Sequence, residues 1–265
     1  MRSIIKLLMP PIFLNILKKL YFTRQFSRKN FKSWEEALKN TTSYNTENVF
    51  NKTLQSARMV RDGKAVYERD SVIFNKIQYD WQLLSSLMLV SNIQKRLNIV
   101  DFGGALGTSY RQNYKYFQTL PVLKKWAIIE QARYVEFGKK EFQDNILSFH
   151  KNLSEIKFDI DLFLMGGSLC YIKNPYKLLE QLIALKPKYI LIIRTPFSTL
   201  TEDKILIQYV PKSIYDASFP IWLFSESKFK NYLSDFYEIF EEWEDNLQAD
   251  PESVAKGILF KLKQG

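Results

Sequence analysis

The sequence has very little cysteine and histidine, and this scarcity excludes several kinds of site. Among its 265 residues Cys170 is the only cysteine and His150 the only histidine. A lone cysteine cannot form an intramolecular disulfide, and one cysteine with one histidine cannot build a Cys/His metal site. We therefore predict no bound metal and no disulfide-stabilised fold.

A long uncharged hydrophobic run is also missing from the start of the chain. Residues 7–17 form an uncharged run of only 11 residues, whereas a membrane-spanning helix needs about 20. No small-residue cleavage site follows this run. We expect neither a spanning helix nor a signal peptide, and we expect a cytoplasmic protein.

Low-complexity tracts and internal repeats are absent as well. Hydrophobic residues make up 46% of the chain and aromatic residues 15%, which is typical of a globular protein. The length fits one α/β domain with additions. We divide the chain into a basic amphipathic segment (1–30), a helical lead-in that covers the domain (31–95) and an α/β domain (96–265).

The net charge of +10 is concentrated at one end of the chain. Residues 1–40 contain nine basic and two acidic residues, and so supply seven of the ten net positive charges. A basic end favours a polyanionic partner, either an anionic membrane or nucleic acid. Because no nucleic-acid-binding motif is visible, the membrane is the favoured partner, at the inner face of the cytoplasmic membrane.

The residues from Pro11 to Leu20 show the periodicity of an amphipathic helix. Apolar side chains recur at helical spacing, and Lys18 and Lys19 lie elsewhere on the helical wheel. Such a helix can lie on a bilayer, or it can pack on the domain or on a partner chain. The sequence leaves both alternatives open.

The stretch from Leu97 to Gly107 is the centre of the predicted domain. An apolar strand runs into Asp101, and Gly103, Gly104 and Gly107 follow before a helix begins at Thr108. Glycines allow a tight turn with positive φ and let a ligand approach the backbone N–H groups at a helix N-terminus. The dinucleotide fingerprint G-x-G-x-x-G is not present. The spacing instead resembles motif I of class I S-adenosylmethionine (AdoMet) methyltransferases, with Ala105 at a position that usually holds glycine.

After this turn, short apolar strands alternate with helical segments. We predict strands at 97–102, 125–130, 146–149, 160–165 and 188–194, and helices near 108–119, 131–142, 175–185 and 226–234. Alternation of this kind predicts a parallel sheet with helices on both faces. Two final strands, at 236–243 and 257–263, have no periodic helix between them. The predicted fold class is therefore α/β, a doubly wound, Rossmann-like sheet with an antiparallel last strand and an N-terminal helical extension.

Upstream of the sheet the chain is predicted to be mostly helical. Ser33 is positioned to cap a helix that begins at Trp34, a second helix runs from Thr46 to near Gly63, and a third spans 79–96.

Several polar and small residues follow the predicted strands and are candidates for cofactor binding. Glu130 ends the second strand, where a carboxylate can accept hydrogen bonds from both ribose hydroxyls. Asp101 is expected to fix the glycine turn by accepting backbone N–H bonds near the amino-acid end of the cofactor. In an α/β sheet the ligand lies beyond the carboxyl ends of the strands. The remaining candidates are Gly103, Gly104, Gly107, Asn152 near the adenine, and Gly166, Gly167 and Ser168 near the transferred methyl group.

Other uses of this architecture are excluded by missing motifs. None of the 15 tyrosines is followed by a lysine four residues later, so the short-chain dehydrogenase pair is absent. The Gly-x-Ser-x-Gly elbow of hydrolases and the P-loop are absent too.

Taken together, these motifs are similar to those of the AdoMet-dependent methyltransferases found in bacterial lipopolysaccharide, O-antigen and capsule biosynthesis loci. The resemblance covers nearly the whole chain. It includes the segments Tyr67–Asp70, Val100–Tyr110, Trp126–Glu130, Ile193–Phe197 and Val210–Trp222. It implies AdoMet as cofactor and a glycan precursor as acceptor. The family often has an Asp where this chain has Ile193, so the chain departs from the pattern beside Arg194.

The segment after the fifth strand carries the predicted acceptor site. Arg194 ends that strand, and residues 195–225 form a proline-containing loop with aromatic side chains. Such a loop suits sugar rings and phosphates, which arginine can bind bidentately. Arg194, Tyr215 and Trp222 are the predicted acceptor residues, and Tyr110 and His150 the candidate proton acceptors.

The sequence thus predicts an AdoMet-dependent O-methyltransferase that acts on a sugar or phosphorylated intermediate of surface polysaccharide synthesis. Two alternatives remain open. One is a catalytically inactive methyltransferase fold that acts as an accessory binding protein at the membrane, and the other is a basic RNA methyltransferase.

Overall fold

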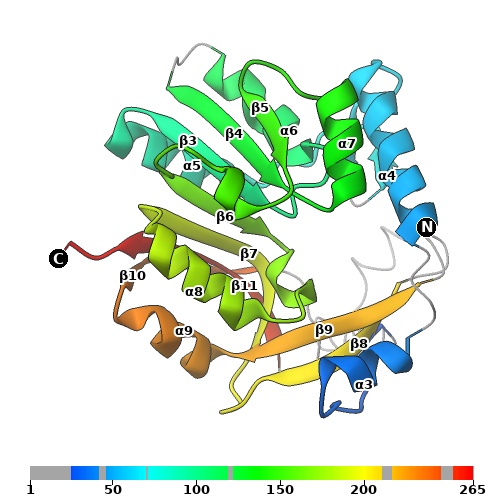
Figure 1. The fold of residues 1–265 in the computed structure, drawn as a ribbon, viewed down its shortest axis with the longest axis vertical. Helices are drawn as coiled ribbons and strands as arrows, with labels where there is room; N and C mark the ends of the chain where they lie inside the picture. Colours follow the sequence, from blue (N-terminus) through cyan, green and yellow to red (C-terminus); the bar gives the residue numbers. More distant parts are fainter. Residues whose placement is uncertain are drawn as a thin grey trace, which may run out of the picture.

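The computed structural model describes residues 25–41, 46–69, 71–118, 122–210, 217–245 and 253–264. A central sheet is covered by helices on both faces, which gives a three-layer α/β architecture (Figure 1). Within the described ranges no helix is long and apolar enough to cross a membrane. Most of the predicted amphipathic segment, residues 1–24, lies outside these ranges, as does Tyr215.

The main sheet has the strand order β10-β11-β7-β6-β3-β4-β5. The pairs formed by β3 with β4 and β6, by β4 with β5 and by β6 with β7 are all parallel. β11 is antiparallel to both β7 and β10. This confirms the predicted parallel sheet with an antiparallel last strand. The strands are β3 (Leu97–Phe102), β4 (Leu123–Ile129), β5 (Leu147–His150), β6 (Leu162–Gly166), β7 (Tyr189–Ser198), β10 (Tyr237–Asp245) and β11 (Ser253–Leu262).

Side chains that alternate along the strands bury two hydrophobic cores, one on each face of the sheet. Ile99 and Leu164 belong to the core beneath α4, α5, α6 and α7, whereas Val100 and Phe163 belong to the core beneath α8 and α9. The central strands β3, β4, β6 and β7 are mostly apolar because both of their faces are covered. The helices are α4 (Thr46–Arg61), α5 (Trp81–Gln94), α6 (Thr108–Phe117), α7 (Ala132–Glu141), α8 (Pro175–Leu185) and α9 (Glu226–Ser234).

The helix starts follow the capping signals in the sequence. Ser33 accepts a hydrogen bond from the Glu36 amide at the start of α3 (Trp34–Lys39), as predicted. Asp80 accepts one from the Leu83 amide, so α5 begins at Trp81 and not at Tyr79. A side-chain oxygen at this position satisfies an amide that the helix itself leaves without a partner.

Two strand pairs were not expected from the sequence. β1 (Tyr67–Arg69) and β2 (Val72–Phe74) form a short antiparallel hairpin inside the predicted helical lead-in. The predicted loop at 195–225 is largely a second antiparallel pair, β8 (Lys204–Tyr209) with β9 (Ser218–Ser225), and β9 continues the sheet beside the end of β7. α3 packs on this pair, which lies at one end of the molecule in Figure 1.

The chain just before α3 also joins β8. The amides of Ser27 and Phe31 donate hydrogen bonds to the carbonyls of Ile207 and Ile205. Ser27 Oγ and Asn30 Oδ1 accept hydrogen bonds from the amides of the same two β8 residues. The first described residues are therefore part of the folded structure.

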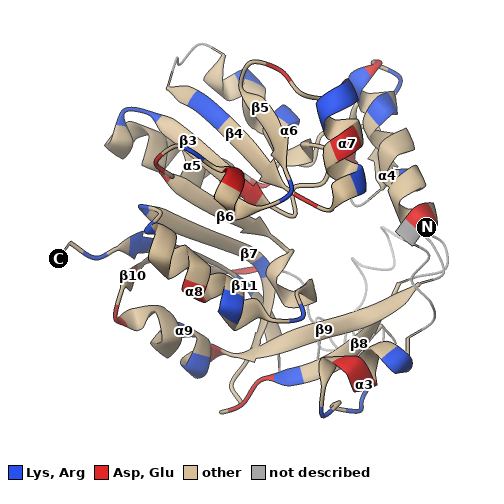
Figure 2. Ribbon diagram, in the orientation of Figure 1, with Lys and Arg blue, Asp and Glu red and all other residues tan. Residues whose placement is uncertain are grey.

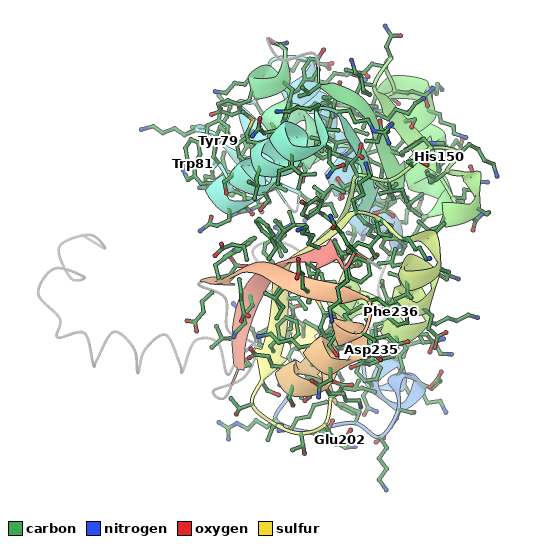
Figure 3. All side chains as sticks on the ribbon, turned by 90° about the vertical axis from the view of Figure 1, so that its left-hand side faces the viewer. Tyr79, Trp81, His150, Glu202, Asp235 and Phe236 are labelled. Carbon is green, nitrogen blue, oxygen red and sulfur yellow. The ribbon has the colours of Figure 1, made fainter. Side chains whose placement is uncertain are left out.

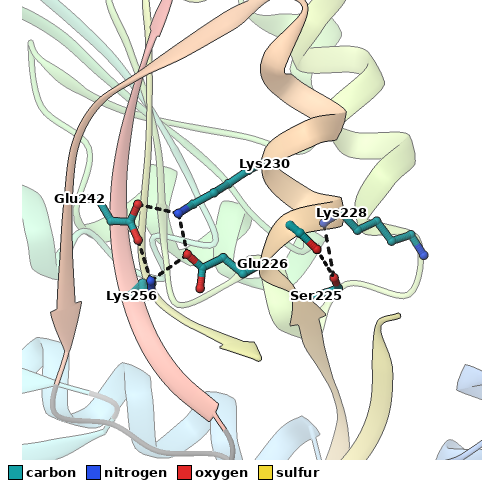
Figure 4. A network of polar contacts seen from close by, with 7 residues as sticks. Ser225, Glu226, Lys228, Lys230, Glu242 and Lys256 are labelled. Carbon is teal, nitrogen blue, oxygen red and sulfur yellow. Dashed lines mark hydrogen bonds and ion pairs between the residues drawn. The ribbon is translucent and has the colours of Figure 1, made fainter. Parts of the chain in front are cut away.

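Charged side chains tie helices to their neighbours at two places. Figure 2 shows basic residues at the adjoining C-terminal ends of α4 and α7, where Arg58 and Arg61 both pair with Glu141. In Figure 4 the carboxylates of Glu226 and Glu242 alternate with the ammonium groups of Lys230 and Lys256, at distances of 2.6–2.8 Å. This closed network links α9 to β10 and β11.

Candidate functional site

A cavity of about 220 Å³ opens at the carboxyl ends of β3, β6 and β7. Two walls enclose it. The wall that we call the sheet wall comes from the strand ends and their turns: Asp101, Gly103, Gly104, Ala105, Gly166, Ile193 and Arg194. The wall that we call the cap wall comes from α4, the β1–β2 hairpin and the start of α5: Val49, Thr53, Tyr67, Glu68, Arg69, Ser71, Asp80 and Leu83.

Glycine is required at the centre of the sheet wall. Gly103 has a φ of +76°, and a Cβ built on it would lie 2.5 Å from Cβ of Ser168. Ser168 itself donates a 2.6 Å hydrogen bond from Oγ to the carbonyl of Phe102. The turns after β3 and β6 are thus in direct contact, as their predicted roles in one pocket require.

Asp101 is buried beside this turn. It is 2% exposed, and the Trp126 indole N–H donates a 3.1 Å hydrogen bond to its Oδ2. We had expected backbone N–H groups as donors, so the indole is the partner that the sequence did not predict. A Cβ on Gly104 would lie 2.6 Å from the carboxyl group, which explains a glycine there. Burial raises the pKa of Asp101 to about 7, although the indole hydrogen bond opposes the shift.

Glu130 reaches the same turn from the next strand. It follows β4 directly, is half-buried, and accepts a 2.8 Å hydrogen bond from the Gln131 amide. Burial raises its pKa, and backbone hydrogen bonds from Gln131 and Ala105 counteract part of this rise. Ala105 has a φ of +48°, so the residue that replaces the usual glycine still adopts the left-handed conformation. The predicted acid therefore lies against the glycine turn.

Arg194 lies at a bulge in β7. Its φ is +56°, and the pairing register with β11 shifts between Lys256 and Ile258, opposite this position. Its amide donates a 2.9 Å hydrogen bond to Asp245, and its Nη2 donates a 2.7 Å hydrogen bond to the carbonyl of Gly166. Bulges of this kind redirect side chains next to binding sites. The sequence predicts that this strand ends at Arg194, whereas β7 continues to Ser198.

The partner strand makes room for this bulge. A Cβ on Gly257 would collide with the indole ring of Trp243, which lies over it. Gly166 and Gly167 lie against the side chain of Arg194. A Cβ built on either glycine would lie 3.4–3.5 Å from a guanidinium nitrogen. Gly166 lines the cavity together with Arg194.

Tyr110 lies away from the cavity, and its predicted role as a proton acceptor needs correction. The ring is 3% exposed within the hydrophobic core, and the hydroxyl donates a 2.9 Å hydrogen bond to Asp144. Burial is the main cause of the raised pKa of this phenol. Such a group supports α6 and does not reach a substrate.

Trp222 also lies outside the cavity lining. Its indole N–H donates a 2.9 Å hydrogen bond to the carbonyl of Ile172, and its ring stacks on Trp34 with the centroids 6.0 Å apart. The predicted contact with the acceptor is therefore wrong for this cavity, because Trp222 instead anchors α3 on β9.

The cavity lining also lacks Gly107, His150 and Asn152 at the same sheet edge, as well as Glu130, Gly167 and Ser168. Gly107, with a φ of +89°, opens α6. His150 contacts Ser148 Oγ at 2.9 Å, and burial lowers its pKa. Figure 3 places it on the opposite side of the molecule from Tyr79 and Trp81. Asn152 is exposed and caps the short 3₁₀ helix Leu153–Glu155. Their roles stay predictions.

The cap wall contains residues to which sequence reasoning gave no role. Thr53, Glu68, Arg69 and Asp80 all line the cavity. The only sequence signal for Glu68 and Arg69 was the segment Tyr67–Asp70, which belongs to the family resemblance but has no chemical motif of its own, and Thr53 and Asp80 had no signal. Among the described residues no group of three His, Cys, Asp or Glu could hold a metal ion.

Among solved structures, the N-terminal domain of EvdMO1, crystallised in the presence of SAH and D-fucose, matches this fold over 83% of the present chain and 97% of its own, with 11% identity and a TM-score of 0.50. The fold is that of class I methyltransferases.

Two other solved structures are similar at lower scores. Magnesium protoporphyrin IX methyltransferase (ChlM) from Synechocystis PCC 6803, with bound SAH, has 11% identity and a TM-score of 0.45 over 80% of this chain and 100% of its own. The N-methyltransferase NodS from Bradyrhizobium japonicum WM9, in complex with SAH, has 10% identity and a TM-score of 0.42 over 70% and 88%. No protein-family model and no curated protein matches the sequence.

Proposed function

We propose that the protein is an AdoMet-dependent methyltransferase that O-methylates a sugar or a phosphorylated intermediate of bacterial surface polysaccharide synthesis. The contact of the Gly103–Ala105 turn with both Ser168 and Glu130 is the observation that carries the proposal. This contact brings the predicted cofactor residues Gly103, Glu130 and Ser168 together at one sheet edge. The similar EvdMO1 domain, crystallised with SAH and D-fucose, supports both the cofactor and a sugar acceptor.

The glycine turn of the sheet wall and the neighbouring Glu130 fit AdoMet in chemistry. Cβ atoms on Gly103 or Gly104 would fill the space against Ser168 and Asp101, so only bare backbone is tolerated there. The Glu130 carboxylate suits the ribose diol, and Asp101 and Gly166 suit the amino-acid end and the methyl group. When bound, AdoMet supplies an electrophilic methyl group on a positively charged sulfur.

The chain promotes such a transfer mainly by holding the two reactants in line. Positioning alone can lower the barrier by several kcal/mol, about 7–11 in the best intramolecular cases. Arg194 is the residue best placed to hold an anionic part of the acceptor, because its backbone is fixed by Asp245 and its side chain lies in the cavity lining. Arginine binds phosphate and carboxylate groups bidentately.

Calorimetry with AdoMet and with NAD tests the cofactor. Gly103→Ala should abolish AdoMet binding, because the new Cβ would meet Ser168. Gly63→Ala is the matched control: its φ of +70° imposes the same backbone strain, but nothing lies within 4 Å of the new Cβ. NAD binding without AdoMet binding would refute the assignment. AdoMet binding without methyl transfer to any glycan precursor would favour the inactive accessory protein.

We further propose that the N-terminal segment binds an anionic membrane. Residues 1–24 include Arg2, Lys6, Lys18, Lys19 and Arg24, and each cation contributes about 1 kcal/mol near an anionic surface. Removal of residues 1–24 should abolish salt-sensitive flotation with phosphatidylglycerol vesicles, with phosphatidylcholine vesicles as control. The truncation stops at residue 24 because the following residues bond to β8. Unchanged flotation would show that the segment is not the membrane anchor.

A further inference from the structure

Glu68 is a buried carboxylate in the wall that faces the cofactor residues. It lies in the middle of β1, is 3% exposed, and lines the same cavity as Gly103 and Arg194. Burying a carboxylate is costly unless other groups stabilise its charge. Glu68 lines the cavity as well as contacting α6, so its carboxylate is placed to meet a bound ligand.

Hydrogen-bond donors and positively charged groups surround the Glu68 carboxylate. The hydroxyl of Thr108 donates a hydrogen bond to Oε1, and Thr108 is the first residue of α6. The N-terminus of a helix carries partial positive charge, and α6 has no acidic residue in its own first turn. The buried guanidinium of Arg111 lies one turn further along α6. Burial lowers the pKa of Arg111, and the nearby charge of Glu68 opposes this shift.

The other two acids of the cavity already have structural partners. Asp80 caps α5 through the amide of Leu83. Asp101 is held by the Trp126 indole and lies under the glycine turn, and its pKa of about 7 leaves it partly protonated near neutral pH. Glu68 differs from Asp80 because it does not cap a helix, and from Asp101 because it lies in the cap wall, opposite the glycine turn.

We propose that Glu68 is the proton acceptor for the hydroxyl group that is methylated. This inference rests on the proposed function. The acceptor oxygen uses a lone pair to form a bond to the methyl carbon while the carbon–sulfur bond breaks and its electron pair returns to sulfur. The hydroxyl proton moves to a carboxylate oxygen of Glu68, which becomes the neutral acid. One positive charge on sulfur and one negative charge on Glu68 are thereby neutralised together.

The hairpin also explains how the acceptor is distinguished from the cofactor. Glycines and Ala105 make up most of the sheet wall, whereas Glu68 shares the cap wall with the side chains of Arg69 and Thr53. A hydroxylated and anionic acceptor would meet a carboxylate for its hydroxyl and arginines for its anion. This is the chemistry of a sugar phosphate or a nucleotide-linked sugar.

The test compares three variants in a methyl-transfer assay with labelled AdoMet, a panel of nucleotide-linked sugars and the small-molecule extract of the producing cells. Glu68→Gln keeps the shape but cannot take a proton, and should lower turnover by about 10²–10⁴-fold, with the AdoMet dissociation constant within about threefold of wild type. Glu68→Asp should recover part of the rate. Glu241→Gln, which removes an exposed acid of β10, should leave the rate unchanged.

The pH profile separates a proton acceptor from a structural residue. The wild-type rate should fall at low pH as a carboxylate becomes protonated, and Glu68→Gln should lose this acidic limb. Wild-type turnover by Glu68→Gln would overturn the inference, as would an AdoMet affinity that falls in proportion to the rate. Absence of labelling by the wild type would instead refute the proposed enzymatic function itself.

Discussion

The sheet wall and the cap wall of the cavity are built in different ways. The sheet wall consists of turns in which small residues expose backbone, and its geometry is fixed by neighbouring strands. The cap wall consists of polar and aromatic side chains that project from a short hairpin and two helix segments. Backbone groups offer the same donors and acceptors in any sequence, whereas side chains can be exchanged without changing the fold.

This difference suggests a division of labour between the walls. A ligand shared by many enzymes can be bound by a wall that depends on the fold, and a ligand peculiar to one enzyme needs a wall that depends on its side chains. Substitutions in the sheet wall should therefore affect AdoMet affinity, and substitutions in the cap wall should affect acceptor use.

After the complete loss expected for Gly103→Ala, the next largest effect on the cofactor is expected at Glu130. Glu130→Gln removes the charge that would accept two ribose hydrogen bonds, each worth about 1.5–3 kcal/mol, so AdoMet affinity should fall about 100-fold in calorimetry. Glu136→Gln, which changes an exposed acid on α7, is the control. Equal affinities for these two proteins would remove Glu130 from the cofactor site.

Arg194 tests the boundary between the walls, because it belongs to the sheet wall but is assigned to the acceptor. Arg194→Ala should lower methyl transfer by about 10–100-fold, the loss of a charge-assisted hydrogen bond to the acceptor, while AdoMet affinity changes by only a few-fold. The rate of methyl transfer by Arg194→Lys should fall between that of the wild type and that of Arg194→Ala. If AdoMet affinity drops as far as transfer does, Arg194 serves the cofactor through its bond to Gly166.

Asp101 should make the stability of the ligand-free protein depend on pH. Its pKa rises from 3.8 to about 7 on folding, so the folded state binds the proton more tightly than the unfolded state. The stabilisation is full below pH 4 and is lost as the pH rises towards 7, by a few kcal/mol in total. Thermal unfolding of wild type and Asp101→Asn across this range should show a difference that changes with pH. Parallel curves would contradict the buried, protonated carboxyl.

The smallest effect on either ligand is expected at Trp222, which lies outside both walls. Trp222→Ala should lower the melting temperature, because it removes the stacking on Trp34 and the hydrogen bond to Ile172. AdoMet affinity and methyl transfer should stay within about threefold of wild type, as is usual for a change that leaves the ligand contacts intact. A selective loss of acceptor use would restore the original assignment of Trp222 to the acceptor.

The sheet wall could be predicted from the sequence because its signals are local. The acid–glycine turn after residues 97–102 and the acid after β4 are each visible within a few residues, and the apolar strands give the parallel sheet. The register of neighbouring strands then brings these turns together without further information.

The cap wall could not be predicted because long-range contacts create it. β1 has the polar sequence Tyr-Glu-Arg, and each hairpin strand has only three residues.

The strand β9 could not be predicted either, because Pro220 disfavours a strand at 218–225. At that residue β9 pairs only with β8, so the missing amide N–H does not interrupt a second ladder. The bulge at Arg194 lies opposite Gly257 of β11, which is more than 60 residues away in the sequence.

The chain before α3, which forms isolated bridges to β8, has a consequence for the solubility of the protein. Without residues 25–31, β8 would be the outer strand of its sheet, with the amides of Ile205 and Ile207 and their carbonyls exposed. An uncovered edge of this kind is a template for pairing between copies, and proteins usually protect it. At the opposite edge β10 carries Glu238, Glu241, Glu242 and Glu244, whose like charges discourage such pairing. Proteolysis after residue 24 should therefore leave a soluble monomeric domain, whereas cleavage a few residues beyond Phe31 should cause aggregation.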